Sequence, residues 1–142
     1  MSVGGRVLLH ASCVASDGKA LLILGPSGSG KSALALELMA LGAALLADDQ
    51  TEVERVEDGL IARCPSALSG LIEARGIGIL RAAAIPEARV VLAVDLGQRE
   101  TQRLPQSRNI PVLGWPVDLV LGQEGRHFSS ALLLRLRSGR VA

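Results

Sequence analysis

The octapeptide GPSGSGKS, residues 25–32, limits what this chain can fold into more than any other feature. It matches the pattern G-x-x-x-x-G-K-[ST], with Gly25, Gly30, Lys31 and Ser32 at the fixed positions. The apolar run ALLILG precedes it as a buried strand, and leucines follow it at helical spacing. A phosphate-binding loop (P-loop) needs this order of strand, loop and helix. The sequence therefore predicts an α/β fold that binds nucleotide phosphates, rather than a glycine turn that binds nothing.

The parts of the octapeptide have different chemical roles. Its backbone N–H groups and the start of the following helix attract phosphate oxygens. Lys31 is expected to reach the β- and γ-phosphates, and the Ser32 hydroxyl is expected to bind Mg²⁺. The predicted nucleotide-binding residues are Gly25, Pro26, Ser27, Gly28, Ser29, Gly30, Lys31 and Ser32.

The remaining segments complete the expected fold. Residues 6–15 read as one strand, followed by a hairpin turn at Asp17-Gly18. A second hairpin joins TEVERV to LIARC, RVVLAVDL reads as another buried strand, and residues 127–137 as a terminal helix. No linker or repeat divides the chain. We expect residues 1–142 to form a single α/β domain with a central mixed β-sheet, flanking hairpins and a C-terminal helix.

Composition excludes several classes of partner. The formal net charge of +1 gives no general attraction to nucleic acid or to an anionic membrane. Trp115 and Phe128 are the only Phe, Trp or Tyr residues, so almost no side chains are available to stack on nucleic-acid bases. No apolar run approaches the length of a membrane span, and the N-terminus lacks a secretion signal. Cys13 and Cys64 are not in metal-ligand spacing and are read as free thiols, with a disulfide as a minor alternative. We expect a cytoplasmic protein without nucleic-acid or membrane partners.

Carboxylates follow two of the buried runs. Asp48 and Asp49 come directly after AALLA, a run expected to lie parallel to the strand before the P-loop. They should therefore reach the sheet edge where ligands of open α/β sheets bind. There a carboxylate can orient a metal or accept a proton, although an Asp pair is also common in turns. Asp95 ends RVVLAVD, as a metal-binding Walker B aspartate does, and is the rival carboxylate.

Two further features carry chemistry-bearing residues. His10 lies near the end of the first predicted strand, where a structural histidine is the commoner reading. Glu73 and Arg75 precede two glycines in LIEARGIGIL, a pattern that allows close backbone approach to metal or phosphate but equally allows a plain loop.

The segments LLHAS, GPSGSGKSALALEL, ADDQTEV, LIEARGIGIL and QRLP together resemble the catalytic domain of bacterial HPr kinase/phosphorylase. The resemblance runs from about residue 7 to residue 103, and LIEARGIGI is close to that family's signature L-x-E-x-R-G-[LI]-G-[IL]. It implies a kinase that uses ATP and Mg²⁺ to phosphorylate a serine of HPr, the small phosphocarrier of the phosphotransferase system. Many members also remove this phosphate by phosphorolysis, which consumes inorganic phosphate and releases pyrophosphate. Family members form hexamers.

The resemblance also implies roles for individual residues. Asp48 would take the proton of the HPr serine, with Asp49 in support and His10 nearby. Glu73 would help Ser32 hold Mg²⁺. Arg103, in QRLP, would help neutralise the transferred phosphoryl group. Asp95 becomes a secondary metal candidate, because the family has no strict acid there.

The sequence also departs from the family. We do not find the N-terminal domain that is usual in the family, nor the P-G-R-N-like motif of its longer members. Ala11 follows His10 where the family usually has glycine. We therefore expect the minimal, single-domain form of the family, with kinase activity retained and phosphorolysis left open. A P-loop kinase of small molecules and a non-catalytic nucleotide sensor are the alternatives. A GTPase is disfavoured, since we find neither N-K-x-D nor a suitable D-x-x-G.

Overall fold

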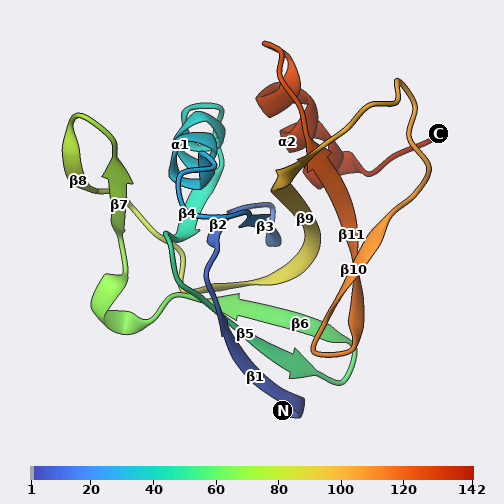
Figure 1. Cartoon of the computed structure of the whole chain (residues 1–142). Helices are drawn as coiled ribbons and strands as arrows, with labels where there is room; N and C mark the ends of the chain where they lie inside the picture. The colour runs from blue at the N-terminus through green and yellow to red at the C-terminus, as the bar shows by residue number, and fades with distance from the viewer. Residues whose placement is uncertain (1) are drawn as a thin grey trace.

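The computed structural model describes residues 2–142 as an α/β fold with a large mixed sheet (Figure 1). The helices are α1 (Lys31–Ala40) and α2 (Phe128–Ser138), with a short 3₁₀ turn, η1 (Ser66–Leu68). The strands are β1 (Ser2–Leu9), β2 (Ser12–Ser16), β3 (Lys19–Leu24), β4 (Ala44–Ala47), β5 (Thr51–Val56), β6 (Gly59–Arg63), β7 (Leu71–Ala74), β8 (Gly78–Arg81), β9 (Glu87–Arg99), β10 (Asn109–Val112) and β11 (Trp115–Gly122).

The main sheet is built around β9. Its strand order is β1-β5-β6-β9-β3-β2-β4, and β11 also pairs with β9 and carries β10 on its other edge. Along one edge, β9 pairs with β3 in parallel. Along the other, its first residues pair with β6 antiparallel and residues 92–95 pair with β11 in parallel. The long strand bends strongly between these partners, as Figure 1 shows.

The alternation of side chains along β3 and β9 divides the core into two clusters. Leu21, Ile23, Leu92 and Val94 face the helices and pack with Leu38 of α1 and the buried leucines of α2. The intervening residues face the opposite side, where the β5–β6 and β10–β11 hairpins cover them. Strands buried on both faces form continuous apolar runs, which is the pattern that ALLILG and RVVLAV show in the sequence. Within residues 2–142, neither helix is long and apolar enough to cross a bilayer.

Most of the predicted elements are confirmed. The hairpin β2–β3 turns at Asp17 and Gly18, whose φ angles of 54° and 75° suit a tight two-residue turn. The β5–β6 hairpin, the buried strand β9 and the terminal helix α2 also lie where the sequence predicts them. The prediction of one strand over residues 6–15 is wrong, because residues 10–11 separate two strands, β1 and β2. There the chain leaves its pairing with β5 and begins pairing with β3 and β4.

Two hairpins were not predicted. The segment LIEARGIGIL forms β7 and β8, a separate two-stranded sheet that projects beside α1 (Figure 1). The strands β10 and β11 form the second, joined by a turn at Leu113 and Gly114. In both cases prolines or glycines interrupt the alternation of apolar and polar residues that predicts a strand.

A buried carboxylate in β5 makes stability sensitive to acid. The Arg63 guanidinium, 2.8 Å from Glu54, lowers the pKa of that carboxyl, and Arg6 adds to the effect. Because the pKa of Glu54 is lower in the folded protein than its ordinary value of 4.5, ionised Glu54 stabilises the fold at pH values above 4.5. This stabilisation is lost as the pH falls through the pKa that Glu54 has in the folded protein. We expect Glu54→Gln to lower the free energy of unfolding at pH 7 and to flatten its decline in acid. Urea unfolding at pH 7 and about pH 3 measures both. Glu57→Gln, in the exposed β5–β6 turn, is the matched control; an unchanged acid profile in Glu54→Gln would contradict this assignment.

Candidate functional site

Residues 25–30, the loop part of the predicted P-loop, join β3 to α1, and glycines at two positions give this loop its shape. Gly25 has a φ of 146°, and a Cβ there would lie 2.5 Å from the Ser29 hydroxyl. Gly30 has a φ of 99° and caps α1 in the left-handed conformation. The buried Lys31 ammonium donates to the carbonyls of Gly25 (2.8 Å) and Pro26 (3.1 Å). These bonds hold the Lys31 side chain against the loop, where the sequence predicts that it contacts the phosphates of a nucleotide.

Asp48 is the best-anchored acidic side chain beside the loop. One carboxylate oxygen, Oδ1, accepts hydrogen bonds from the hydroxyls of Ser32 (2.7 Å) and Ser12 (2.8 Å). The other, Oδ2, accepts one from the backbone N–H of Glu73 (3.0 Å). The residue is 9% exposed. These three bonds fix the carboxylate next to the hydroxyl that the sequence predicts as a metal ligand.

Asp49 has different surroundings. Its φ of 66° lies in the left-handed region, which Asp tolerates better than most residues, and its side chain is 61% exposed. Its carboxylate lies 3.4 Å from His10 Nδ1. On the other side of the imidazole, His10 Nε2 lies 3.4 Å from the hydroxyl of Ser27 in the P-loop. Asp49 and His10 therefore form an accessible pair beside the loop.

The topology explains why these residues meet. Both β3 and β4 run antiparallel to β2, which lies between them, so their carboxyl ends reach the same sheet edge. Sequence reasoning anticipated this common direction but not the intervening strand. His10 reaches the same edge because it lies in the connection between β1 and β2, and β2 begins beside the end of β3.

Ser12 is a site residue that the sequence did not reveal. It is fully buried, its hydroxyl donates to Asp48, and the same oxygen accepts from the backbone N–H of Asp49 (3.2 Å). It thus fixes both aspartates at once. A serine next to Cys13 in an apolar run has no spacing signal that could have identified it.

The remaining predicted residues lie in different surroundings. Glu73 reaches the site through its backbone, and its side chain is exposed on β7. Asp95 binds within its own strand: its oxygens accept hydrogen bonds from the Gly97 N–H and the Gln98 amide, both 2.8 Å. Arg103 is exposed in the segment between β9 and β10, and the hydrogen bonds and ion pairs found within residues 2–142 do not include it.

Cys64 lies close enough to the site to be influenced by it. Burial raises the pKa of its thiol, and the negative charge of Asp48 raises it further. Cys13 is fully buried, and burial raises the pKa of its thiol strongly. Both cysteines are free, as the sequence predicted, and their thiols are poor nucleophiles at neutral pH.

The oxygen donors near the P-loop suit Mg²⁺. Ser32 and Asp48 present a hydroxyl and a carboxylate, which are hard ligands. No group of three or more His, Cys, Asp or Glu side chains within residues 2–142 could enclose a metal. Mg²⁺ is usually bound by one or two protein oxygens together with substrate phosphates, and the Ser32 hydroxyl and the Asp48 carboxylate fit such a site.

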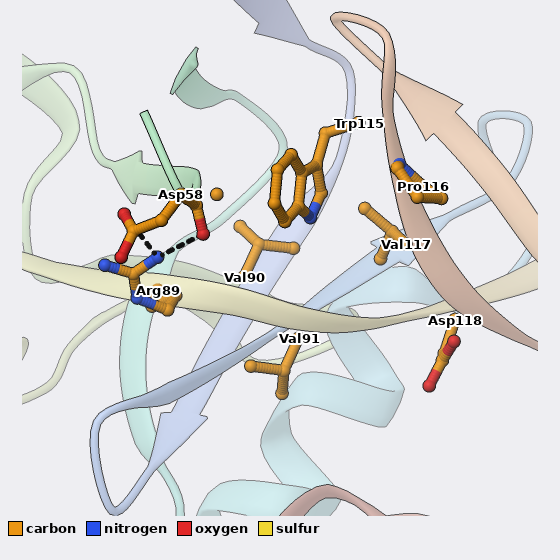
Figure 2. A pocket seen from close by; sticks show the side chains of 9 residues that line it. Asp58, Arg89, Val90, Val91, Trp115, Pro116, Val117 and Asp118 are labelled. Atoms are coloured by element: carbon orange, nitrogen blue, oxygen red, sulfur yellow. Dashed lines mark hydrogen bonds and ion pairs between the residues drawn. The ribbon is translucent and has the colours of Figure 1, made fainter. Parts of the chain in front are cut away.

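A pocket of about 230 Å³ lies at the other end of β9, away from the P-loop (Figure 2). Trp115 and the valines of β9 and β11 line it beside Arg89, which donates to the Asp58 backbone carbonyl (2.9 Å) and side chain (3.2 Å). Figure 2 shows this ion pair on one side of the pocket. None of the predicted site residues lines it, and its arginine is already paired, so we assign it no part in the site.

Comparison with known proteins relates the chain to one family. The family model described as the HPr Serine kinase C-terminal domain matches residues 2–103. HPr kinase/phosphorylase of Cupriavidus necator is 38% identical over 127 residues, covering 81% of this chain and 39% of that protein. The homologue from Burkholderia lata is 36% identical over 141 residues, covering 91% of this chain and 44% of the relative.

A solved structure shows the same fold. The Hpr(Ser) kinase/phosphatase from Coxiella burnetii superposes with a TM-score of 0.78 at 26% sequence identity, covering 92% of this chain and 88% of that chain. The chain spans about two fifths of the length of the curated relatives that it matches. On the family model and these relatives, this chain belongs to the HPr serine kinase C-terminal domain family.

Proposed function

We propose that this protein is an ATP-dependent serine kinase that phosphorylates HPr or an HPr-like phosphocarrier of the phosphotransferase system. The observation that carries the proposal is that two aspartates, Asp48 and Asp49, both lie beside the P-loop. Asp48 is bonded to Ser32 of the loop, and the exposed Asp49–His10 pair lies beside Ser27. A P-loop alone serves many activities, whereas an accessible carboxylate beside it suits transfer to a hydroxyl acceptor.

The geometry favours a division of roles that is the reverse of the one the resemblance implies. All three hydrogen bonds to Asp48 come from within the protein, which suits a carboxylate that stays in place beside a metal. The Asp49 side chain is exposed, and its carboxylate lies beside the His10 imidazole. We assign Asp49 the role of accepting the serine proton, with His10 as its orienting partner, and Asp48 that of holding the Mg²⁺ side with Ser32.

Phosphoryl transfer then depends mainly on position and on neutralisation of charge. Mg²⁺, when bound, would supply positive charge at the β- and γ-phosphates. Lys31 and the backbone N–H groups of the loop add to it at the phosphate oxygens. Glu73 is proposed to assist at the metal and Arg103 at the phosphoryl group, each through its exposed side chain.

The resemblance supports further parts of the proposal. HPr or an HPr-like carrier is the acceptor, residues 1–142 act as one domain, and the protein is cytoplasmic and assembles into a homo-oligomer, a hexamer in the family pattern. Phosphorolysis would use the same loop, with inorganic phosphate in the place of the β-phosphate. There it would take the phosphoryl group from phosphoserine and leave as pyrophosphate, while the serine oxygen takes up a proton.

Incubation with labelled ATP, Mg²⁺ and the HPr proteins of the same organism tests the proposal. We expect labelled phosphoserine on one of them, and incubation of that product with inorganic phosphate tests for the reverse reaction. Transfer to none of the carriers would contradict the kinase proposal. Specific thermal stabilisation by a small hydroxyl compound would then favour a small-molecule kinase. Cellular function that survives Asp49→Asn would favour a nucleotide sensor.

A further inference from the structure

The strand β9 carries an irregularity beside the P-loop. Between Leu121 and Gly122 the strand β11 advances by one residue, whereas its partner positions on β9 pass from Asp95 to Arg99. Residues 96–98 thus form a bulge without partners on β11. Bulges of this kind redirect side chains and are frequent next to functional sites.

Asp95 holds this bulge in shape. Its two oxygens accept hydrogen bonds from the Gly97 N–H and the Gln98 side-chain amide. The bulge also packs on the P-loop: a Cβ on Gly97 would lie 3.1 Å from Cδ of Pro26, and one on Gly25 would lie 3.3 Å from Cβ of Leu96. The acid that ends RVVLAVD thus shapes the strand beside the P-loop instead of pairing with Ser32.

The bulge forms one wall of a cavity of about 350 Å³. Ser29 of the P-loop, the bulge and the end of β11 line the cavity. The Ser29 hydroxyl is buried and has no hydrogen-bond partner among the described residues. At the mouth, Arg99 pairs with Glu124 at 3.0 Å, and both side chains are exposed. The volume lies within the range of about 300–1,000 Å³ that small-molecule sites occupy.

The cavity and the acidic residues lie on opposite flanks of the P-loop strand. In the sheet, β2 and β4 lie on one side of β3 and lead to Asp48 and Asp49. On the other side lie β9 and β11, which lead to the cavity. A nucleoside triphosphate is a linear molecule whose γ-phosphate and nucleoside are at opposite ends. With the γ-phosphate facing the acidic flank, the nucleoside falls on the flank of β9 and β11.

The geometry points to this cavity as the nucleoside subsite for ATP, with Gln123 and Glu124 as its specificity-determining residues. This inference rests on the proposed function for the orientation of the nucleotide. The Glu124 carboxylate can accept hydrogen bonds from ribose hydroxyls, as acidic residues do in dinucleotide sites. The Gln123 amide can both donate to and accept from the edge of a base. The Gln98 carbonyl oxygen, left available by the bond of its amide nitrogen to Asp95, can accept from an exocyclic amino group.

The test compares ATP with a probe that lacks the nucleoside. Isothermal titration with Mg²⁺ measures the affinities of wild type and of the double variant Q123A/E124A for ATP and for inorganic tripolyphosphate. We expect the variant to lose about tenfold in ATP affinity while its tripolyphosphate affinity changes less than about twofold. The control, E57A/Q106A, removes the same residue types at exposed positions outside the cavity and should retain both affinities.

A second measurement is independent of affinity. Photolabelling of the wild type with 8-azido-ATP should modify peptides containing residues 96–99 or 122–124. An ATP affinity that is unchanged, or that falls together with tripolyphosphate affinity, overturns the inference, as does label elsewhere in the chain. If the wild type phosphorylates no HPr protein, the proposed function fails, and the binding and labelling results still decide the cavity.

Discussion

Asp49→Asn is expected to lower the kcat of HPr phosphorylation by about 10²- to 10⁴-fold, which is the usual contribution of a general base. The substitution keeps the size of the side chain but removes the carboxylate that faces solvent beside His10. Because the three hydrogen bonds of Asp48 do not involve the Asp49 side chain, ATP affinity should remain close to that of the wild type. Single-turnover kinetics with labelled ATP and isothermal titration measure the two quantities separately.

Asp48→Asn is the informative comparison for this prediction. It replaces a carboxylate oxygen that accepts from Ser32, so we expect a higher Mg²⁺ concentration for half-maximal activity. His10→Gln should reduce kcat less than Asp49→Asn does, because it removes only the orienting partner. A normal kcat in Asp49→Asn, together with a loss in Asp48→Asn that added Mg²⁺ does not restore, would return the proton-accepting role to Asp48.

Lys31→Met is expected to reduce kcat/KM for phosphoryl transfer by about 10²- to 10³-fold, the usual loss when one donor to developing charge is removed. Lys31 is buried, and its ammonium donates to the Gly25 and Pro26 carbonyls of the loop that is predicted to hold the phosphates. Methionine keeps the length of the side chain but supplies no charge. Steady-state kinetics with varied ATP gives the ratio.

Lys19→Met provides a matched control, since Lys19 is the other lysine of the chain. Its ammonium donates to the Arg137 carbonyl of α2 (2.7 Å), away from the P-loop. We expect it to retain near-wild-type kcat/KM, with at most a lower melting temperature. Equal losses in the two variants would mean that the effect comes from stability, and the assignment of Lys31 to the phosphates would then fail.

The sequence predicted those parts of the fold that local chemistry determines. The P-loop, its flanking strand and helix, and the hairpin at Asp17-Gly18 are all encoded by neighbouring residues. The common direction of β3 and β4 followed from two short buried runs joined by a helix. The location of Asp48 and Asp49 at the sheet edge where β3 also ends was predicted for the same reason.

What the sequence could not predict depends on contacts between distant residues. Adjacent aspartates read alike, yet one is buried against Ser12 and Ser32 and the other is exposed beside His10. The role of Ser12 depends on a partner 36 residues away. Asp95 matches a metal-binding pattern, but the bulge that engages it becomes visible only when β11 pairs with β9.

The central position of β9 has a consequence for biosynthesis. The strand joins β3 to β6 and β11, so partners distant in sequence must all find it. A nascent chain that has not yet emerged beyond residue 86 contains the whole P-loop, but one edge of β3 is bare. Such non-local pairing is slow to form and exposes apolar edges meanwhile. Nucleotide binding should therefore arise only after β9 has emerged, well after the loop itself has left the ribosome.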